Sequence, residues 1–267
     1  MLSKSCEVRS PFTVFTSGAA IGTLGGLIGL GGAEFRLPLL IGLFGFGALE
    51  AVVLNKAMSL IVVAAALPLR TGAVPFSSVL SHWDVVLTLL SGSLAGAWFG
   101  AGWATRLRSQ TLYRVITVLL VVIAAALLWG HGVQSGESAA FDGLSLVLAG
   151  SFAGVGIGIV AAVLGVAGGE LLIPTIVLLF GLDLKLAGSL SLAVSLPTMV
   201  TSFTRYSQDR SFAVIGTQRR FIAVMALGSL VGAWLGGLLL GLVPTGWLLP
   251  LLAAILVVSA VKVWRHG

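Results

Sequence analysis

Two glutamates are the residues of this chain whose setting most strongly suggests chemistry. Glu34 and Glu170 each follow a cluster of small residues inside an apolar stretch, and they lie 136 residues apart (170 − 34). A charged carboxylate at membrane depth costs about 3 kcal/mol on insertion scales, so two matched ones are hard to ascribe to chance. One interpretation is that both cap the starts of short helices by accepting backbone N–H bonds. The other is that both exchange a proton linked to a substrate, because burial and a nearby anion favour the neutral carboxyl.

A single cation stands beside the first glutamate. Arg36 has no charged counterpart in the second half of the chain, since the matching position is Leu172. Its guanidinium could pair with Glu34, hold an anion in bidentate geometry, or extend to a membrane interface. Because an apolar run begins at position 35, we expect Arg36 to extend to the interface.

Further polar side chains follow at matched positions. Asn55 and Ser59 are four residues apart on one face of a predicted helix, and Lys56 adjoins Asn55. Ser191 and Ser195 occupy the corresponding positions in the second half. We expect this set to line a substrate cavity beside the glutamates, with Lys56, if it lies deep, as a second contact for an anion. The alternative is that these groups join helices through hydrogen bonds, as serines often do in membranes.

The composition indicates the solvent of the surrounding chain. Of the 267 residues, 58% are hydrophobic and only 9% are charged, and the mean hydropathy is +1.11. A soluble domain carries about 25% charged residues, so the composition predicts an all-α integral membrane protein. The net charge of +6 requires no nucleic-acid partner, because basic residues in cytoplasmic loops give the same balance. The lone Cys6 excludes an internal disulfide.

The sequence gives no sign of an enzyme. It contains no nucleophile–base arrangement, no phosphate-binding loop and no histidine spacing typical of metal ligands. We therefore expect neither catalysis nor a cofactor.

Ten apolar runs provide the elements that must position the polar groups. A helix that crosses the bilayer needs about 20 residues. The runs at 35–48 and 171–182 fall short of that length and both follow a glycine cluster, which predicts broken or re-entrant helices. The runs lie near 13–31, 35–48, 50–69, 85–105, 112–131, 144–166, 171–182, 186–204, 219–241 and 246–264.

The same shift of 136 residues aligns more than the two glutamates. It carries Gly29 onto Gly165 and the segment GSLAGAWFG (92–100) onto GSLVGAWLG (228–236) without a gap. The chain is therefore a duplication. We expect a cytoplasmic N-terminal segment (1–12), a first transmembrane repeat (13–131), a periplasmic linker (132–143) and a second transmembrane repeat (144–267).

Basic residues predict how the two halves point. They cluster near both termini, shortly after position 105, and between 205 and 220. The positive-inside rule places all of these clusters, and both termini, in the cytoplasm. That requires an odd number of crossings per half, so the second repeat is inverted relative to the first. If the glycine segment only kinks one crossing, the halves are parallel instead; we favour the inverted arrangement.

The glycine clusters explain how a helix can stop inside the membrane. Glycine turns without steric cost, and a short helix that begins near Glu34 points its positive end at the break, which suits a small anion. Pro38 is expected in the first turn of that helix, where its missing N–H matters least. The small residues of the candidate substrate site are Gly29, Gly31, Gly32, Ala33, Gly165, Gly168 and Gly169.

Other glycines are assigned to helix packing. A spacing of four recurs in two places, at Gly92, Gly96 and Gly100 and at Gly228, Gly232 and Gly236. Small residues at this spacing bring helix backbones together. The spacing permits a homodimer without requiring one.

The two glycine segments resemble a known signature. GGLIGLGGAEFRLPLL (25–40) and AAVLGVAGGELLIPTI (161–176) are similar to the paired glycine-rich motif of the sulfite exporter TauE/SafE family. Ala33 and Ala167 interrupt the glycine triplets, and a glutamate follows in both halves. The resemblance implies a multi-pass permease of the bacterial inner membrane that moves small sulfur-containing anions such as sulfite or organosulfonates.

These observations predict a secondary transporter for a small anion that works by proton-linked alternating access. One alternative is a permease for a divalent metal cation, with Glu34 and Glu170 as oxygen ligands. Another is a membrane subunit that transports nothing itself. A subunit would not need matched polar groups at depth in both halves, which argues against it.

Overall fold

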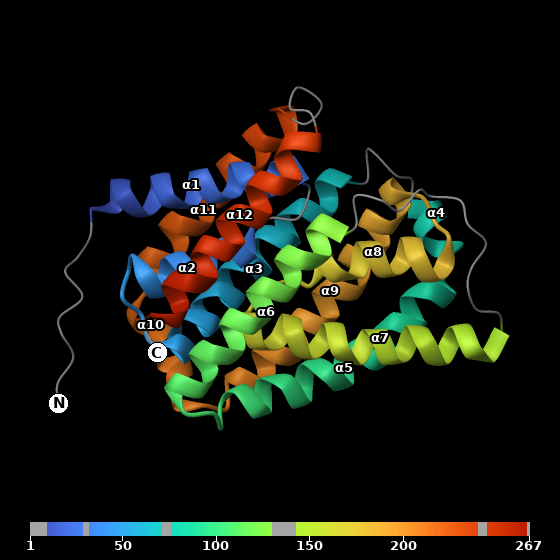
Figure 1. Cartoon of the computed structure of the whole chain (residues 1–267), viewed down its shortest axis with the longest axis horizontal. Helices are drawn as coiled ribbons and strands as arrows, with labels where there is room; N and C mark the ends of the chain where they lie inside the picture. The colour runs from blue at the N-terminus through green and yellow to red at the C-terminus, as the bar shows by residue number, and fades with distance from the viewer. Residues whose placement is uncertain (1–9, 29–31, 71–75, 130–142, 240–244, 266–267) are drawn as a thin grey trace.

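The computed structural model describes residues 10–28, 32–70, 76–129, 143–239 and 245–265 (Figure 1). The regular structure of these residues is helical. The first half contains α1 (Pro11–Ile28), α2 (Ala33–Gly42), α3 (Ala48–Arg70), α4 (Phe76–Leu80), α5 (Trp83–Ala104) and α6 (Ser109–Trp129). The second half contains α7 (Gly143–Leu164), α8 (Gly169–Phe180), α9 (Leu184–Tyr206), the 3₁₀ helix η2 (Arg210–Phe212), α10 (Ala213–Thr217), α11 (Arg219–Leu239) and α12 (Thr245–Trp264).

The helix limits repeat with the shift found in the sequence. The helices α2, α3, α5 and α6 start at 33, 48, 83 and 109, and α8, α9, α11 and α12 start at 169, 184, 219 and 245, each 136 residues later. Each of the ten predicted apolar runs contains one of the main helices, although α2 ends at Gly42, before the predicted limit of 48, and the run ends at 29–31, 130–131 and 240–241 lie outside the described residues. The short helices α4, η2 and α10 are additional elements that hydrophobicity alone did not indicate.

The first helix of each half packs against a helix of the other half. In the structure α1 packs along α11 and α7 packs along α5, so each repeat supplies one partner to the other. A Cβ atom on Gly92 would run into the backbone carbonyl of Ser151, and one on Gly228 into that of Phe15. Because only glycine allows this approach, the prediction that these glycines serve helix packing is confirmed.

Several helices are long and apolar enough to cross a membrane. Among the described residues the candidates are Ala48–Ala65, Trp83–Ala104, Gly143–Leu164, Leu186–Tyr206 and Arg219–Leu239. With 10 residues in α2 and 12 in α8, these two helices are too short for a full crossing, as predicted. The structure is that of a multi-pass helical membrane protein.

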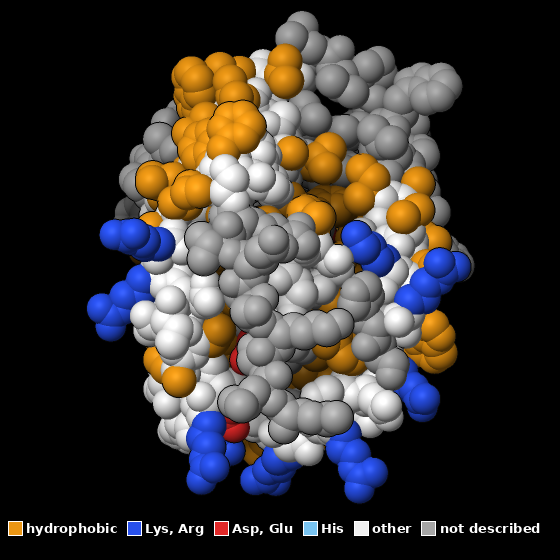
Figure 2. Space-filling model, turned by 90° about the vertical axis from the view of Figure 1, so that its left-hand side faces the viewer, with side chains coloured by type: hydrophobic (Ala, Val, Ile, Leu, Met, Phe, Trp, Pro, Cys, Tyr) orange, Lys and Arg blue, Asp and Glu red, His pale blue; other side chains and the backbone are white. Residues whose placement is uncertain are grey.

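The first helices of the two halves, α1 and α7, run in opposite directions (Figure 1). In Figure 1, α1 begins at the end of the molecule where α12 finishes and runs away from it, whereas α7 runs towards that end. The turn between α5 and α6 lies at the same end. Figure 2 views this end and shows Lys and Arg side chains spread around its rim, with few acidic side chains.

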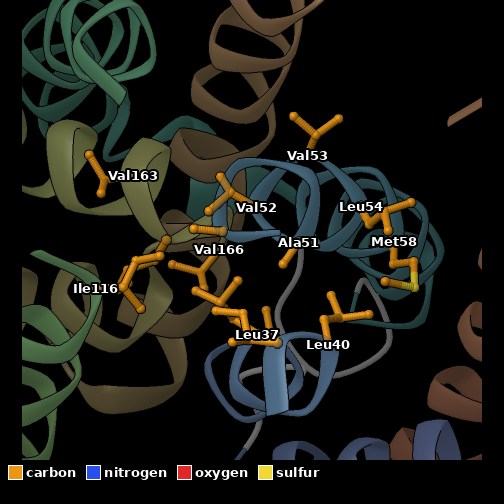
Figure 3. Close-up of a cluster of buried hydrophobic side chains, with 14 of the residues drawn as sticks. Leu37, Leu40, Ala51, Val52, Val53, Leu54, Met58, Ile116, Val163 and Val166 are labelled. Carbon is orange, nitrogen blue, oxygen red and sulfur yellow. The ribbon is translucent and has the colours of Figure 1, made fainter. Parts of the chain in front are cut away.

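The short helix α2 is enclosed by the core. Leu37 and Leu40 from α2 belong to one buried cluster with Val52 and Met58 from α3 and with Val166, which lies between α7 and α8 (Figure 3). The chain therefore stops its helices where protein, and not lipid, surrounds the freed backbone groups. This is the condition under which a break at membrane depth is tolerated.

Candidate functional site

The two helix breaks depend on glycine. Gly32 and Gly168 precede α2 and α8 with φ angles of 69° and 83°, and Gly165 follows α7 with φ of 68°. These left-handed conformations favour glycine because it lacks a Cβ atom. Both predicted breaks are confirmed, between Ile28 and Ala33 and between Leu164 and Gly169.

Each glutamate stands at the second residue of a short helix, inside the protein. The side chains of Glu34 and Glu170 are 1% and 3% exposed, and their carboxyl groups lie close enough to interact electrostatically. Among the described residues, Oε2 of Glu34 and both carboxyl oxygens of Glu170 have no hydrogen-bond partner. The capping interpretation is therefore wrong for Glu170, whose oxygens accept no backbone N–H from these residues.

The proline of each short helix lies deeper in the helix than expected. Pro38 and Pro174 are the sixth residues of α2 and α8, in the second turn, so the first-turn prediction for Pro38 is wrong. A proline has no N–H to give to the residue four positions before it. The backbone carbonyls of Glu34 and Glu170 therefore lack the usual intrahelical donor.

Arg36 does not reach a membrane interface, and that prediction is wrong. Its side chain is fully buried, and Nη1 donates to Ser59 Oγ at 3.3 Å and to Asn55 Oδ1 at 3.5 Å. Nη2 donates to Ser229 Oγ at 3.2 Å, while Nε has no partner among the described residues. Glu34 is close enough to interact electrostatically with the guanidinium but makes no hydrogen bond with it.

A buried guanidinium held by neutral oxygens is an unusual arrangement. Its three partners come from α3 and α11, so two helices far apart in sequence fix its position. A buried charge normally needs a counter-charge in direct contact, because desolvation is costly. An anion near Nε would supply that counter-charge.

Lys56 lies deep in the protein, with a fully buried side chain, and its ammonium group donates to backbone carbonyls. Its Nζ donates to the carbonyls of Ala161 and Val166, at 2.8 Å each. Ala161 lies in the last turn of α7, whose carbonyls lack intrahelical donors. The positive charge of Lys56 also complements the negative end of the α7 dipole. The ammonium group lies near Glu170 and interacts with it electrostatically.

Asn55 joins the two breaks. Its Nδ2 donates to the carbonyl of Ala33 at 3.0 Å, at the first break, and to that of Leu164 at 3.1 Å, at the second. The hydroxyl of Tyr206 donates to the carbonyl of Ala162 at 3.0 Å. Side chains from α3 and α9 thus replace the backbone donors that α7 loses where it ends.

The predicted serines fall into three different situations. Ser59 accepts a hydrogen bond from Arg36, and Ser191 donates to the Gly188 carbonyl of its own helix at 2.9 Å. Ser195 is 1% exposed, and its hydroxyl has no partner among the described residues.

The remaining members of the candidate site are small residues at the breaks. Gly29 and Gly31 lie outside the described residues. The structure places the others at the two breaks, namely Gly32, Ala33, Gly165, Gly168 and Gly169.

Sequence reasoning missed several buried polar side chains, among them Tyr206 and the three described next. Ser229 holds Arg36, and Ser93 forms a 2.8 Å hydrogen bond with Thr198. A signal was present, because Ser93 and Ser229 match under the shift of 136 (229 − 93) inside the glycine-spaced helices. These helices were assigned to packing alone, although each carries a buried hydroxyl.

A metal centre finds no support from side-chain clustering. Among the described residues, no group of three or more His, Cys, Asp or Glu side chains lies together. The two glutamates provide carboxyl oxygens only, with Arg36 and Lys56 near them.

Buried charges at two helix breaks, inside a bundle of apolar helices, define a multi-pass membrane protein with a polar site at its centre. The chain belongs to the Sulfite exporter TauE/SafE family, whose model matches residues 14–263. The resemblance of the two glycine segments is thereby confirmed over nearly the whole chain, and membership implies a membrane transporter. Comparison with curated proteins and with solved structures found no match.

Proposed function

We propose that this protein is a secondary transporter for a small anion, with sulfite or another sulfur-containing anion as substrate. The observation that carries the proposal is the fully buried Arg36, whose direct partners are all neutral and whose Nε is unpartnered among the described residues. An anion at the breaks would supply a counter-charge in direct contact with the guanidinium. The amides at the starts of α2 and α8 offer further donors.

The charges at the breaks favour coupling to a proton. Two carboxyl groups (Glu34 and Glu170) and two cations (Arg36 and Lys56) are buried there, so the ionised set is neutral. A bound anion would leave this set with surplus negative charge in a medium of low dielectric constant. Protonation of one glutamate restores the balance. Glu34 and Glu170 are therefore the proposed proton-linked groups.

The proposed mechanism is alternating access between two inverted repeats. The opposite directions of α1 and α7, and the exchange of helices between the halves, support this arrangement (Figure 1). The basic rim in Figure 2 supports a cytoplasmic location for that end, with both termini there and residues 132–143 on the periplasmic side of a bacterial inner membrane. The breaks would meet near the midplane.

Transport into proteoliposomes tests the proposal. Sulfite flux should follow an imposed pH gradient in the wild type, and Glu34→Gln, Glu170→Gln or the double variant should abolish this dependence. Glu50→Gln is the matched control, because Glu50 is an exposed carboxyl at the start of α3. Coupling that survives in all three site variants would exclude the two glutamates as proton carriers. Absence of any flux in the wild type would favour the alternative of a non-transporting subunit.

A divalent cation is the second candidate substrate. The unpartnered oxygens of Glu34 and Glu170 favour it, since hard cations prefer carboxylate ligands. The nearby charges of Arg36 and Lys56 oppose it. Binding of Mn²⁺ to the purified protein, with no binding of sulfite, would decide for the cation.

A further inference from the structure

The two halves differ at one matched position beside each break. Arg36 in α2 corresponds to Leu172 in α8 (172 − 36 = 136), and Ser59 corresponds to Ser195 (195 − 59 = 136). In the first half Arg36 Nη1 donates to Ser59, so the Ser59 hydroxyl has a partner. In the second half Leu172 has no donor to give, and the Ser195 hydroxyl is without a partner among the described residues. Of the two matched serines, Ser59 therefore has a side-chain partner, whereas Ser195 has none within the described part of the chain.

Ser195 lies next to the second break. It shares a face of α9 with Leu192, three residues before it, and Met199, four residues after it. Both of these residues belong to one packed cluster with Ala167. Ala167 stands between α7 and α8, three residues before Glu170. The free hydroxyl is thus beside the loop that starts α8.

Other groups at the second break also retain hydrogen-bonding capacity. Both carboxyl oxygens of Glu170 are unpartnered among the described residues. The backbone amides of Gly169 and Glu170, in the first turn of α8, have no acceptor among those residues either. An anion is favoured at such a helix start. The Lys56 ammonium group adds positive charge near the Glu170 carboxyl.

We infer that a single small oxoanion binds off the axis between the repeats, against the second break, with the Ser195 hydroxyl and the first amides of α8 as its donors. Arg36 contributes positive charge from the first half. There its own side chain occupies the position beside Ser59 that corresponds to the anion position beside Ser195. The inference rests on the proposed function and specifies where the anion binds. Two equivalent repeats would instead hold one anion equally or bind two anions. The ligand class is a compact oxoanion with one or two charges.

Calorimetric titration of the purified full-length protein tests the inference, with sodium sulfite and sodium methanesulfonate as probes. The wild type should bind one anion per chain. Ser195→Ala should weaken binding about tenfold or more, because a hydroxyl that donates to an anion makes a charge-assisted hydrogen bond. Ser202→Ala is the matched control, since Ser202 is buried in the same helix and donates only to its own backbone, at Thr198 and Met199. This control should bind as the wild type does.

A second variant fills the proposed anion site with a side chain of the protein itself. Leu172→Arg introduces the arginine that the first half has at the matched position 36. Its guanidinium should donate to Ser195 and abolish anion binding, while Leu172→Met should bind the anion as the wild type does. If Leu172→Arg does not fold, Ser195→Ala decides. Two equivalent sites in the wild type, or unchanged affinity in Ser195→Ala, would overturn this inference and leave the proposed function standing. A wild type that binds neither probe would overturn both.

Discussion

The stability of the second break should depend on Lys56, and Lys56→Met tests this. Methionine keeps an unbranched side chain of similar length but removes the charge and the donors. Two hydrogen bonds are lost, to the carbonyls of Ala161 and Val166. The Ala161 carbonyl still accepts from the Val166 amide at 3.0 Å, whereas the Val166 carbonyl has no other donor among the described residues. The variant therefore leaves one buried carbonyl unpaired.

An unpaired buried carbonyl costs about 1–3 kcal/mol. At about 3 °C per kcal/mol for a chain of this size, the melting temperature should fall by about 3–9 °C. The measurement is thermal unfolding of the purified protein in detergent, followed by tryptophan fluorescence and by size-exclusion chromatography.

Tyr206→Phe is the matched control for Lys56→Met. It removes the donor to the Ala162 carbonyl, but that carbonyl still accepts from the Gly165 amide at 3.1 Å. No carbonyl becomes unpaired, so the loss should stay near the net value of one hydrogen bond, about 1 kcal/mol. If Lys56→Met melts at the wild-type temperature, or no lower than Tyr206→Phe, then Lys56 does not hold the end of α7 in the way described.

Two further variants test the joining of the halves. Asn55→Leu leaves the carbonyls of Ala33 and Leu164 without their side-chain donor, and should lower the free energy of unfolding by about 2–4 kcal/mol in an equilibrium unfolding experiment. A loss below that of Tyr206→Phe would contradict this role. Gly96→Ala should destabilise the α5–α7 contact by about 1–3 kcal/mol, because the new Cβ meets the Val155 backbone. In Gly156→Ala, by contrast, the Cβ meets nothing within 4 Å, so equal melting temperatures for these two alanine variants would refute the packing argument.

Much of the fold followed from local pattern. The hydrophobic runs gave the ten main helices, because the length and polarity of a run decide whether it can be helical in lipid. The breaks before Ala33 and Gly169 followed from glycine clusters, since glycine readily takes the left-handed conformations observed there. The role of Arg36 did not follow, because three explanations suited the same sequence and hydrophobicity cannot distinguish burial from an interface.

The sequence by itself determined that the chain is a duplication, where its ten main helices lie to within a few residues at their starts, and which polar residues stand at its two breaks. Only the tertiary structure decided what each of these residues contacts. Lys56 meets the end of α7, which is 105 residues away at Ala161, and Arg36 meets Ser229, which is 193 residues away. The reason is physical: a buried donor must find an acceptor, and which acceptor is within reach depends on how α1 packs on α11 and α5 on α7.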